Sequence, residues 1–181
     1  MLSREKIQKV SMNGRMAYIV LCVEKYLITK YPEKDWSILS EKMWPVTSEA
    51  WDEWIESFIE IIPQYLFEFE SYEDSDFEEL TKEEYLSFVE LYRGVSEGKY
   101  EDSSDKLGVL LSLLKDLEEV YCYTSIPGVG EESIDIVACA CEMLESEGIG
   151  LPDIEKVDFS LFSEKNGWGN TFNGRKLSLI L

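Results

Sequence analysis

The sequence predicts an all-α protein with six to seven helices in a single compact domain, packed in an orthogonal or bundle-like way with short loops. Apolar residues recur at helical spacing along most of the chain. No stretch shows the sustained strict alternation of a half-buried strand. With 181 residues, 45% of them hydrophobic, the chain can close one core. Within this domain of residues 1–181, we expect a helical core over 1–152, with 153–181 forming a short turn and a C-terminal loop packed on it.

The first long helix is predicted from Met12 to about Lys30, because Pro32 stops it. Asp35 can cap a short second helix that ends before Pro45. The inward positions are Met16, Ile19, Val20, Val23 and Leu27 in the first helix, and Trp36, Leu39 and Met43 in the second.

A tryptophan-rich third helix follows. Thr47 or Ser48 can serve as its N-cap, and Pro63 ends or kinks it. Its inward face is formed by Trp51, Trp54, Ile55, Phe58 and Ile62.

Capping signals mark two further helices. Thr81 is followed three residues later by Glu84, which predicts a capping box, and Gly94 can end that helix. Ser103 or Ser104 can open the most regular helix of the chain, whose apolar stripe is Leu107, Leu110, Leu111, Leu114, Leu117 and Tyr121.

Glycines flank the last long helix, which Gly128 and Gly130 precede and Gly148 closes. Glu131 and Glu132 follow the first two glycines directly and would repel a phosphate, so we interpret this motif as a helix cap and not as a phosphate-binding loop. A short helical turn near residues 159–162 is the last element expected.

Charge is distributed unevenly along the chain. The formal net charge is −20, and residues 49–105 hold 19 acids against 3 bases, with a peak from Glu68 to Glu84. This charge disfavours direct contact with nucleic acid or an anionic membrane and favours a basic protein partner. The chain has no histidine, so the commonest general base and neutral metal ligand are missing. We expect a binding protein that is not an enzyme and uses no cofactor and no metal.

Aromatic residues are interleaved with the acids of this peak. Steering charge beside aromatic anchors is typical of a protein-binding surface. A solvated acidic loop that keeps the protein soluble remains the alternative. The candidate partner-binding residues are Glu70, Tyr72, Glu73, Asp74, Asp76, Phe77, Glu78 and Glu79.

Two chemical interpretations of the same run are disfavoured. If Asp74 opened an EF-hand loop, position 6 would be Glu79 where glycine is needed, and position 12 would be Tyr85 where glutamate is needed. Paired-carboxylate catalysis requires two carboxyl groups fixed across a cleft with different pKa values, and a solvated run supplies no such environment.

The four cysteines, Cys22, Cys122, Cys139 and Cys141, each lie in an apolar stretch. We expect them to be reduced, core-filling side chains and not metal ligands. The first ten residues contain no apolar run typical of a signal peptide, and the longest apolar run, 17–23, is too short to span a bilayer. A cytoplasmic location is therefore expected.

Two further features remain open. Glycines on either side of Trp168, in the loop 166–170, let the backbone aim the ring, which predicts either a loop pinned to the core or a binding loop. Arg15 and Arg175 are two of only four arginines, and we expect each to have an acidic partner within the fold.

The order of these features resembles the helical immunity proteins of bacterial toxin systems, including contact-dependent and polymorphic toxins. The shared features are an opening helix with Gly-Arg-Met-Ala-Tyr at 14–18, tryptophans at 44, 51 and 54, an acidic middle and a Leu-rich helix, and they extend over residues 12–148. The resemblance implies a small cytosolic protein that binds and occludes a toxin domain, with no catalytic residues.

These observations favour an acidic cytoplasmic protein that neutralises a cognate, basic toxin domain by occlusion. A DNA mimic that inhibits a nucleic-acid-binding protein is the nearest alternative, and a helical enzyme or enzyme subunit is the third. The oligomeric state is left open.

Overall fold

The computed structural model describes residues 2–99, 104–121 and 123–181, and in these ranges the protein is all-α, as the sequence predicts. An isolated antiparallel bridge between Val10 and Leu161 is the only strand-like pairing in the described ranges. The α-helices are α1 (Arg4–Lys9), α2 (Met12–Lys30), α3 (Ser37–Met43), α4 (Trp51–Ile59), α5 (Pro63–Leu66), α6 (Lys82–Tyr92), α7 (Lys106–Val120) and α8 (Glu131–Ser146). The 3-10 turns are η1 (Trp44–Thr47), η2 (Tyr72–Asp74), η3 (Ile154–Lys156), η4 (Lys165–Gly167) and η5 (Gly174–Leu177).

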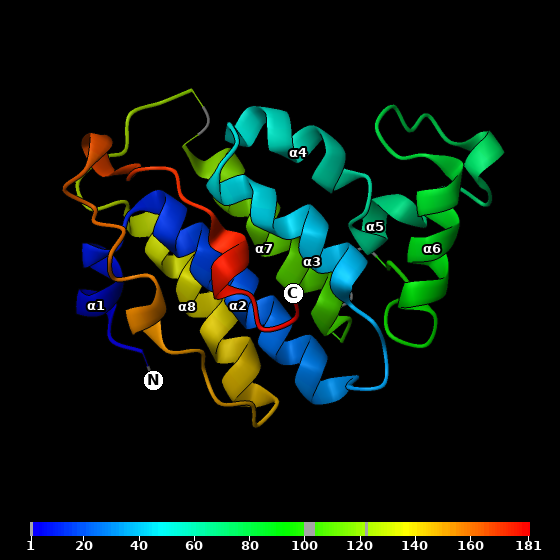
Figure 1. The fold of residues 1–181 in the computed structure, drawn as a ribbon, viewed down its shortest axis with the longest axis horizontal. Helices are drawn as coiled ribbons and strands as arrows, with labels where there is room; N and C mark the ends of the chain where they lie inside the picture. The colour runs from blue at the N-terminus through cyan, green and yellow to red at the C-terminus, as the bar shows by residue number, and fades with distance from the viewer. Residues whose placement is uncertain (1, 100–103, 122) are drawn as a thin grey trace.

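Helix α2 is the centre of the molecule. It lies between α7 and α8 and contacts both, while η1 packs on it from a further side (Figure 1). The sequence predicts a single apolar stripe for this helix, but every residue from Met12 to Glu24 is buried. A helix that is covered on nearly all sides is the core of the bundle and not one of its outer walls.

The remaining helices extend the bundle outward. Helix α4 packs on α3 and α7, and α5 and α6 contact each other at one end of the molecule (Figure 1). Helix α1, which the sequence pattern does not predict, packs on α8, where Arg4 forms ion pairs with Glu131 and Asp135. Helix α5 is also new, since Pro63 opens a short helix there instead of only ending the previous one.

Helix starts agree with the sequence prediction where the cap is a complete local motif. Both hydrogen bonds of the Thr81 and Glu84 capping box are present at the start of α6. Helix α4, by contrast, begins after Ala50, so neither Thr47 nor Ser48 caps it, because the chain continues through Pro45 as the 3-10 turn η1.

The cap of α7 also differs from the prediction. Its N-cap is Asp105, whose carboxylate accepts a hydrogen bond from the Gly108 amide at 2.9 Å, and not Ser104. Ser103, the other candidate for this cap, lies outside the described residues, as does Cys122. Cys22 and Cys141 are buried and Cys139 is half-buried, in line with core-filling side chains.

The C-terminal segment runs back over the bundle. The helical turn predicted at 159–162 is wrong, because Leu161 there pairs with Val10 and the 3-10 turns η3, η4 and η5 lie on either side. Turn η5 contacts η1, and the amide of Leu179 donates to the buried carboxylate of Glu24 at 2.6 Å. A buried acid of α2 thus fixes the end of the chain across the core (Figure 1).

Arg15 is almost fully buried beside the loop that precedes α8. Its guanidinium donates to the carbonyl oxygens of Val129 at 2.9 Å and Gly130 at 3.1 Å, and it lies over the ring of Phe162. The expected carboxylate partner is therefore replaced by backbone carbonyls, whereas Arg175 does pair with Glu41. Burial lowers the pKa of Arg15 to about 10.

Candidate binding surface

The acid-rich segment between α5 and α6 has a defined backbone, held by a single carboxylate. Glu60, directly after α4, accepts hydrogen bonds from the amides of Glu78 at 2.7 Å, Glu79 at 3.1 Å and Leu80 at 2.6 Å. Consecutive amides of this kind form a cradle for an anion. An acid of α4 therefore fixes a loop that is itself acidic, and joins the two elements into one surface.

A small aromatic cluster supports the same segment from beneath. The rings of Phe69, Tyr72, Phe77 and Tyr85 lie with neighbouring centroids 5.7–6.3 Å apart. Tyr85 belongs to α6 and is buried, whereas the other three are half-buried. Tyr72 and Phe77, predicted as partner anchors, thus pack largely against their own fold and hold the loop in shape.

The predicted acids all remain at the surface. Glu70, Asp74, Asp76, Glu78 and Glu79 are exposed, and none of them forms an ion pair with another described residue. Glu73 is also exposed and pairs with Lys82, whose charge and hydrogen bond lower the pKa of the Glu73 carboxyl. The structure therefore gathers the predicted acidic residues on one solvent-facing segment.

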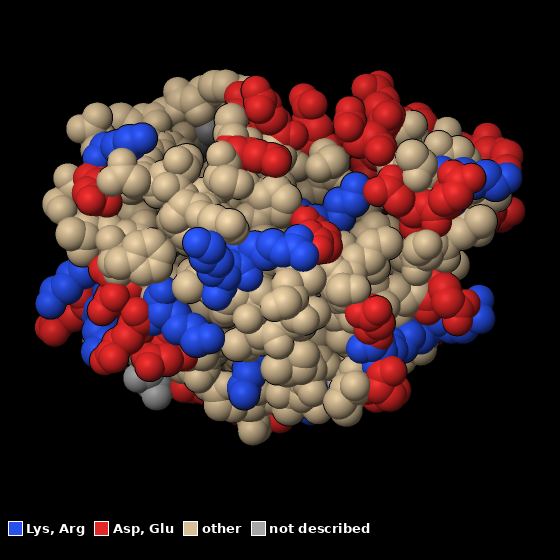
Figure 2. All heavy atoms as spheres, in the orientation of Figure 1, with Lys and Arg blue, Asp and Glu red and all other residues tan. Residues whose placement is uncertain are grey.

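The acidic surface is larger than the sequence run alone. Figure 2 shows acidic side chains gathered along one edge of the molecule, over α4 as well as over the segment between α5 and α6. The exposed acids of α4 and of the turn before it lack ion pairs within the described ranges. We call the combined surface the acidic band, and it consists of Glu49, Asp52, Glu53, Glu56, Glu68, Glu70, Glu73, Asp74, Asp76, Glu78 and Glu79.

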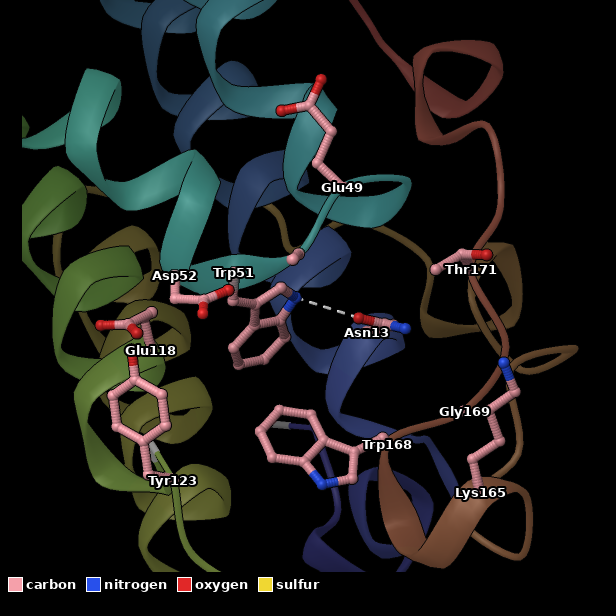
Figure 3. A pocket seen from close by; sticks show the side chains of 11 residues that line it. Asn13, Glu49, Trp51, Asp52, Glu118, Tyr123, Lys165, Trp168, Gly169 and Thr171 are labelled. Carbon is pink, nitrogen blue, oxygen red and sulfur yellow. Dashed lines mark hydrogen bonds between the residues drawn. The ribbon is translucent and has the colours of Figure 1, made fainter.

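A pocket of about 350 Å³ opens at the α4 end of this band (Figure 3). Two of its walls are the indole rings of Trp51 and Trp168, which meet edge to face with centroids 5.2 Å apart. Tyr123, with an exposed fraction of 89%, lines a third side. Trp168 thus packs against α4 and also lines a cavity, so the two alternatives for its loop hold together.

Asn13 of α2 positions both tryptophans. Its side-chain oxygen accepts from the Trp51 indole at 3.0 Å, and its backbone amide donates to the carbonyl oxygen of Trp168 at 3.1 Å. Its side-chain amide also donates to the carbonyl of Asn170 at 3.4 Å. The aromatic walls are therefore held by the central helix of the fold.

The charged lining of the pocket is mainly acidic. Glu49, Asp52 and Glu118 contribute carboxylates, and Lys165 contributes the single ammonium group among the lining residues. In Figure 3 the Asp52 and Glu118 carboxylates lie on the same side as Tyr123, while the Lys165 side chain lies on the opposite side. Sequence reasoning missed Asp52 and Glu118 as neighbours, because α4 and α7 meet only in the tertiary structure.

Comparisons with known proteins add no assignment: no family model, curated protein or solved structure matches this chain. Among the described residues, no group of three or more histidine, cysteine, aspartate or glutamate side chains has an arrangement that could hold a metal ion. None of the helices in the described ranges has the length and apolar character needed to cross a membrane.

Proposed function

We propose that the protein is an acidic binding protein that neutralises a basic protein partner, such as a toxin domain, by covering its working surface, as the immunity proteins that it resembles do. The observation that carries this proposal is the acidic band. Of its eleven carboxylates, only that of Glu73 has an ion-pair partner among the described residues. Charge that is not compensated within the fold attracts a partner of opposite charge over a long range.

The proposed mechanism is steric and electrostatic, without a catalytic step. The acidic band raises the rate of encounter, and the contact area formed afterwards slows dissociation. The Glu60 carboxylate and the aromatic cluster hold the band in one shape before binding. A surface fixed in advance loses little conformational entropy when the partner binds.

Capture from the native cell at low salt, followed by elution at rising salt, tests this proposal. The tagged protein is compared with a variant in which Glu73, Asp74, Asp76, Glu78 and Glu79 are replaced by their amides. We expect a basic partner at one-to-one stoichiometry. With the purified partner, the variant should associate at least tenfold more slowly at low salt and with a weaker salt dependence, because steering depends on these charges.

A matched control separates position from net charge. Five exposed acids outside the band that have no ion pair in the described ranges are Glu33, Glu132, Glu142, Glu155 and Asp158. Their replacement by amides makes the same change in net charge and should leave the association rate within about threefold. Equal effects of the two variants would contradict a specific docking surface, and capture of a nucleic-acid-binding protein would favour DNA mimicry.

A further inference from the structure

We infer that the pocket between Trp51 and Trp168 receives the side chain of an arginine from the basic partner. This inference rests on the proposed function, since it names the group of the partner that this end of the acidic band would bind. The nature of the pocket walls, the placement of charge and the rigidity of the site support it independently of one another.

The walls suit a flat cation. Trp51, Trp168 and Tyr123 present aromatic rings to one cavity of about 350 Å³. Aromatic faces attract cations, tryptophan most strongly, and a planar guanidinium also stacks on such rings. An uncharged apolar occupant would fit the rings but would leave the neighbouring carboxylates without a partner.

The charges of the lining point to the same class of occupant. Three carboxylates face one ammonium group, and Asp52 and Glu118 lie beside Tyr123, away from Lys165 in the view of Figure 3. A guanidinium between the rings would have carboxylates on one side, which matches its fork of N–H donors. The Lys165 ammonium on the far side disfavours a second cation there.

Continuity with the acidic band identifies the source of the cation. Glu49 and Asp52 belong both to the band and to the pocket. A basic protein lying along the band therefore has its charged side chains at the mouth of the pocket. This placement favours an arginine of that partner over a free organic cation.

The pocket is formed before any ligand arrives. Asn13 holds the side chain of Trp51 and the backbone of Trp168. The three non-glycine residues with positive φ in the described chain are Tyr123 at 58°, Lys165 at 45° and Asn166 at 56°, and all three line or adjoin the pocket. Such conformations persist only where the surrounding structure imposes them, and they concentrate at binding and active sites.

Titration with a short peptide tests the inference. The probe is N-acetyl-Gly-Arg-Gly-amide, and its control replaces arginine by citrulline, which has nearly the same shape and no charge. NMR of the ¹⁵N-labelled protein follows the indole N–H signals of Trp51 and Trp168. We expect the arginine peptide to shift both signals with a Kd of roughly 1 mM and to bind at least tenfold more tightly than the citrulline peptide.

A matched pair of variants locates the charge effect. Asp52→Asn should weaken binding of the arginine peptide about fivefold or more, while Glu53→Gln, also in the first turn of α4 but outside the pocket, should change it less than twofold. Equal binding of the two peptides, equal effects of the two variants, or tighter binding of tetramethylammonium than of the arginine peptide would each overturn the inference.

The failure of this inference and the failure of the proposed function give different results. Salt-sensitive capture of a basic partner without peptide binding would refute the pocket and support the binding function. Peptide binding without any basic partner would support the pocket as a guanidinium site and overturn the proposed function.

Discussion

Glu24 is a carboxylate buried in the middle of the central helix. It is fully buried and has no cationic partner among the described residues. Its oxygens instead accept from the Trp44 indole at 2.7 Å, from the Ser178 hydroxyl at 2.6 Å and from the Leu179 amide at 2.6 Å, and also from the hydroxyl of Ser40. A buried charge is tolerated only where such donors replace its hydration.

Replacing this carboxylate by an amide is expected to release the C-terminal segment. In Glu24→Gln, one oxygen becomes an NH₂ group, which cannot accept from both Leu179 and the other donors. We expect the free energy of unfolding to fall by about 2–3 kcal/mol, as for other hydrogen bonds to charged groups. Urea unfolding measures this change, and faster hydrogen exchange at the Leu179 amide would show where it acts.

The exposed Glu33→Gln provides the control for Glu24 and should be neutral within about 0.5 kcal/mol. If Glu24→Gln were as stable as the parent and its Leu179 amide stayed protected, the network around Glu24 would not hold the segment.

At the scale of single elements, helix α6 and helix α4 provide a comparison between two predicted caps. Thr81→Ala removes the hydroxyl that accepts from the Glu84 amide, so we expect a loss of about 1 kcal/mol. Ser48→Ala should be nearly neutral, because Ser48 lies outside α4 and its hydroxyl donates to the exposed turn at Pro45. Urea unfolding of both variants decides, and equal losses would contradict the observed starts of the two helices.

The same two helices show what the sequence can predict. The capping box of α6 was predictable because its donors and acceptors are only three residues apart. The start of α4 was not, because Thr47 is used elsewhere: its hydroxyl accepts from the amide of Gly174, a contact across most of the chain. Local motifs are visible in sequence, whereas caps displaced by tertiary contacts are not.

The candidate site follows the same division. The acidic segment was predictable from composition, and its acids are exposed as expected. The orientation of Tyr72 and Phe77 toward Tyr85 was not, since it depends on how the segment folds onto α6. The pocket combines residues from α2, α4, α7 and the loop around Trp168, so only the unusual glycine-flanked tryptophan gave a signal in sequence.

For the molecule as a whole, the acidic band opposes the fold that carries it. Like charges within about 8 Å of one another repel at physiological salt, and they repel over longer distances at lower salt. The segment stays compact because the amides held by Glu60 and the aromatic cluster outweigh this repulsion. A surface that lowers stability in the free protein is best explained by a gain that appears on binding.

Neutralising part of the band should therefore stabilise the free protein. Glu68, Glu70, Asp76, Glu78 and Glu79 have no ion pair in the part of the chain that the structure describes, so their replacement by amides removes repulsion without breaking a pair. We expect the melting temperature to rise by about 2–4 °C at 10 mM salt and the gain to shrink at 500 mM, where screening already suppresses the repulsion. Calorimetry at the two salt concentrations measures both effects. An unchanged or lower melting temperature at low salt would show that the band imposes no strain on the fold, and the stability argument for a binding role would then be lost.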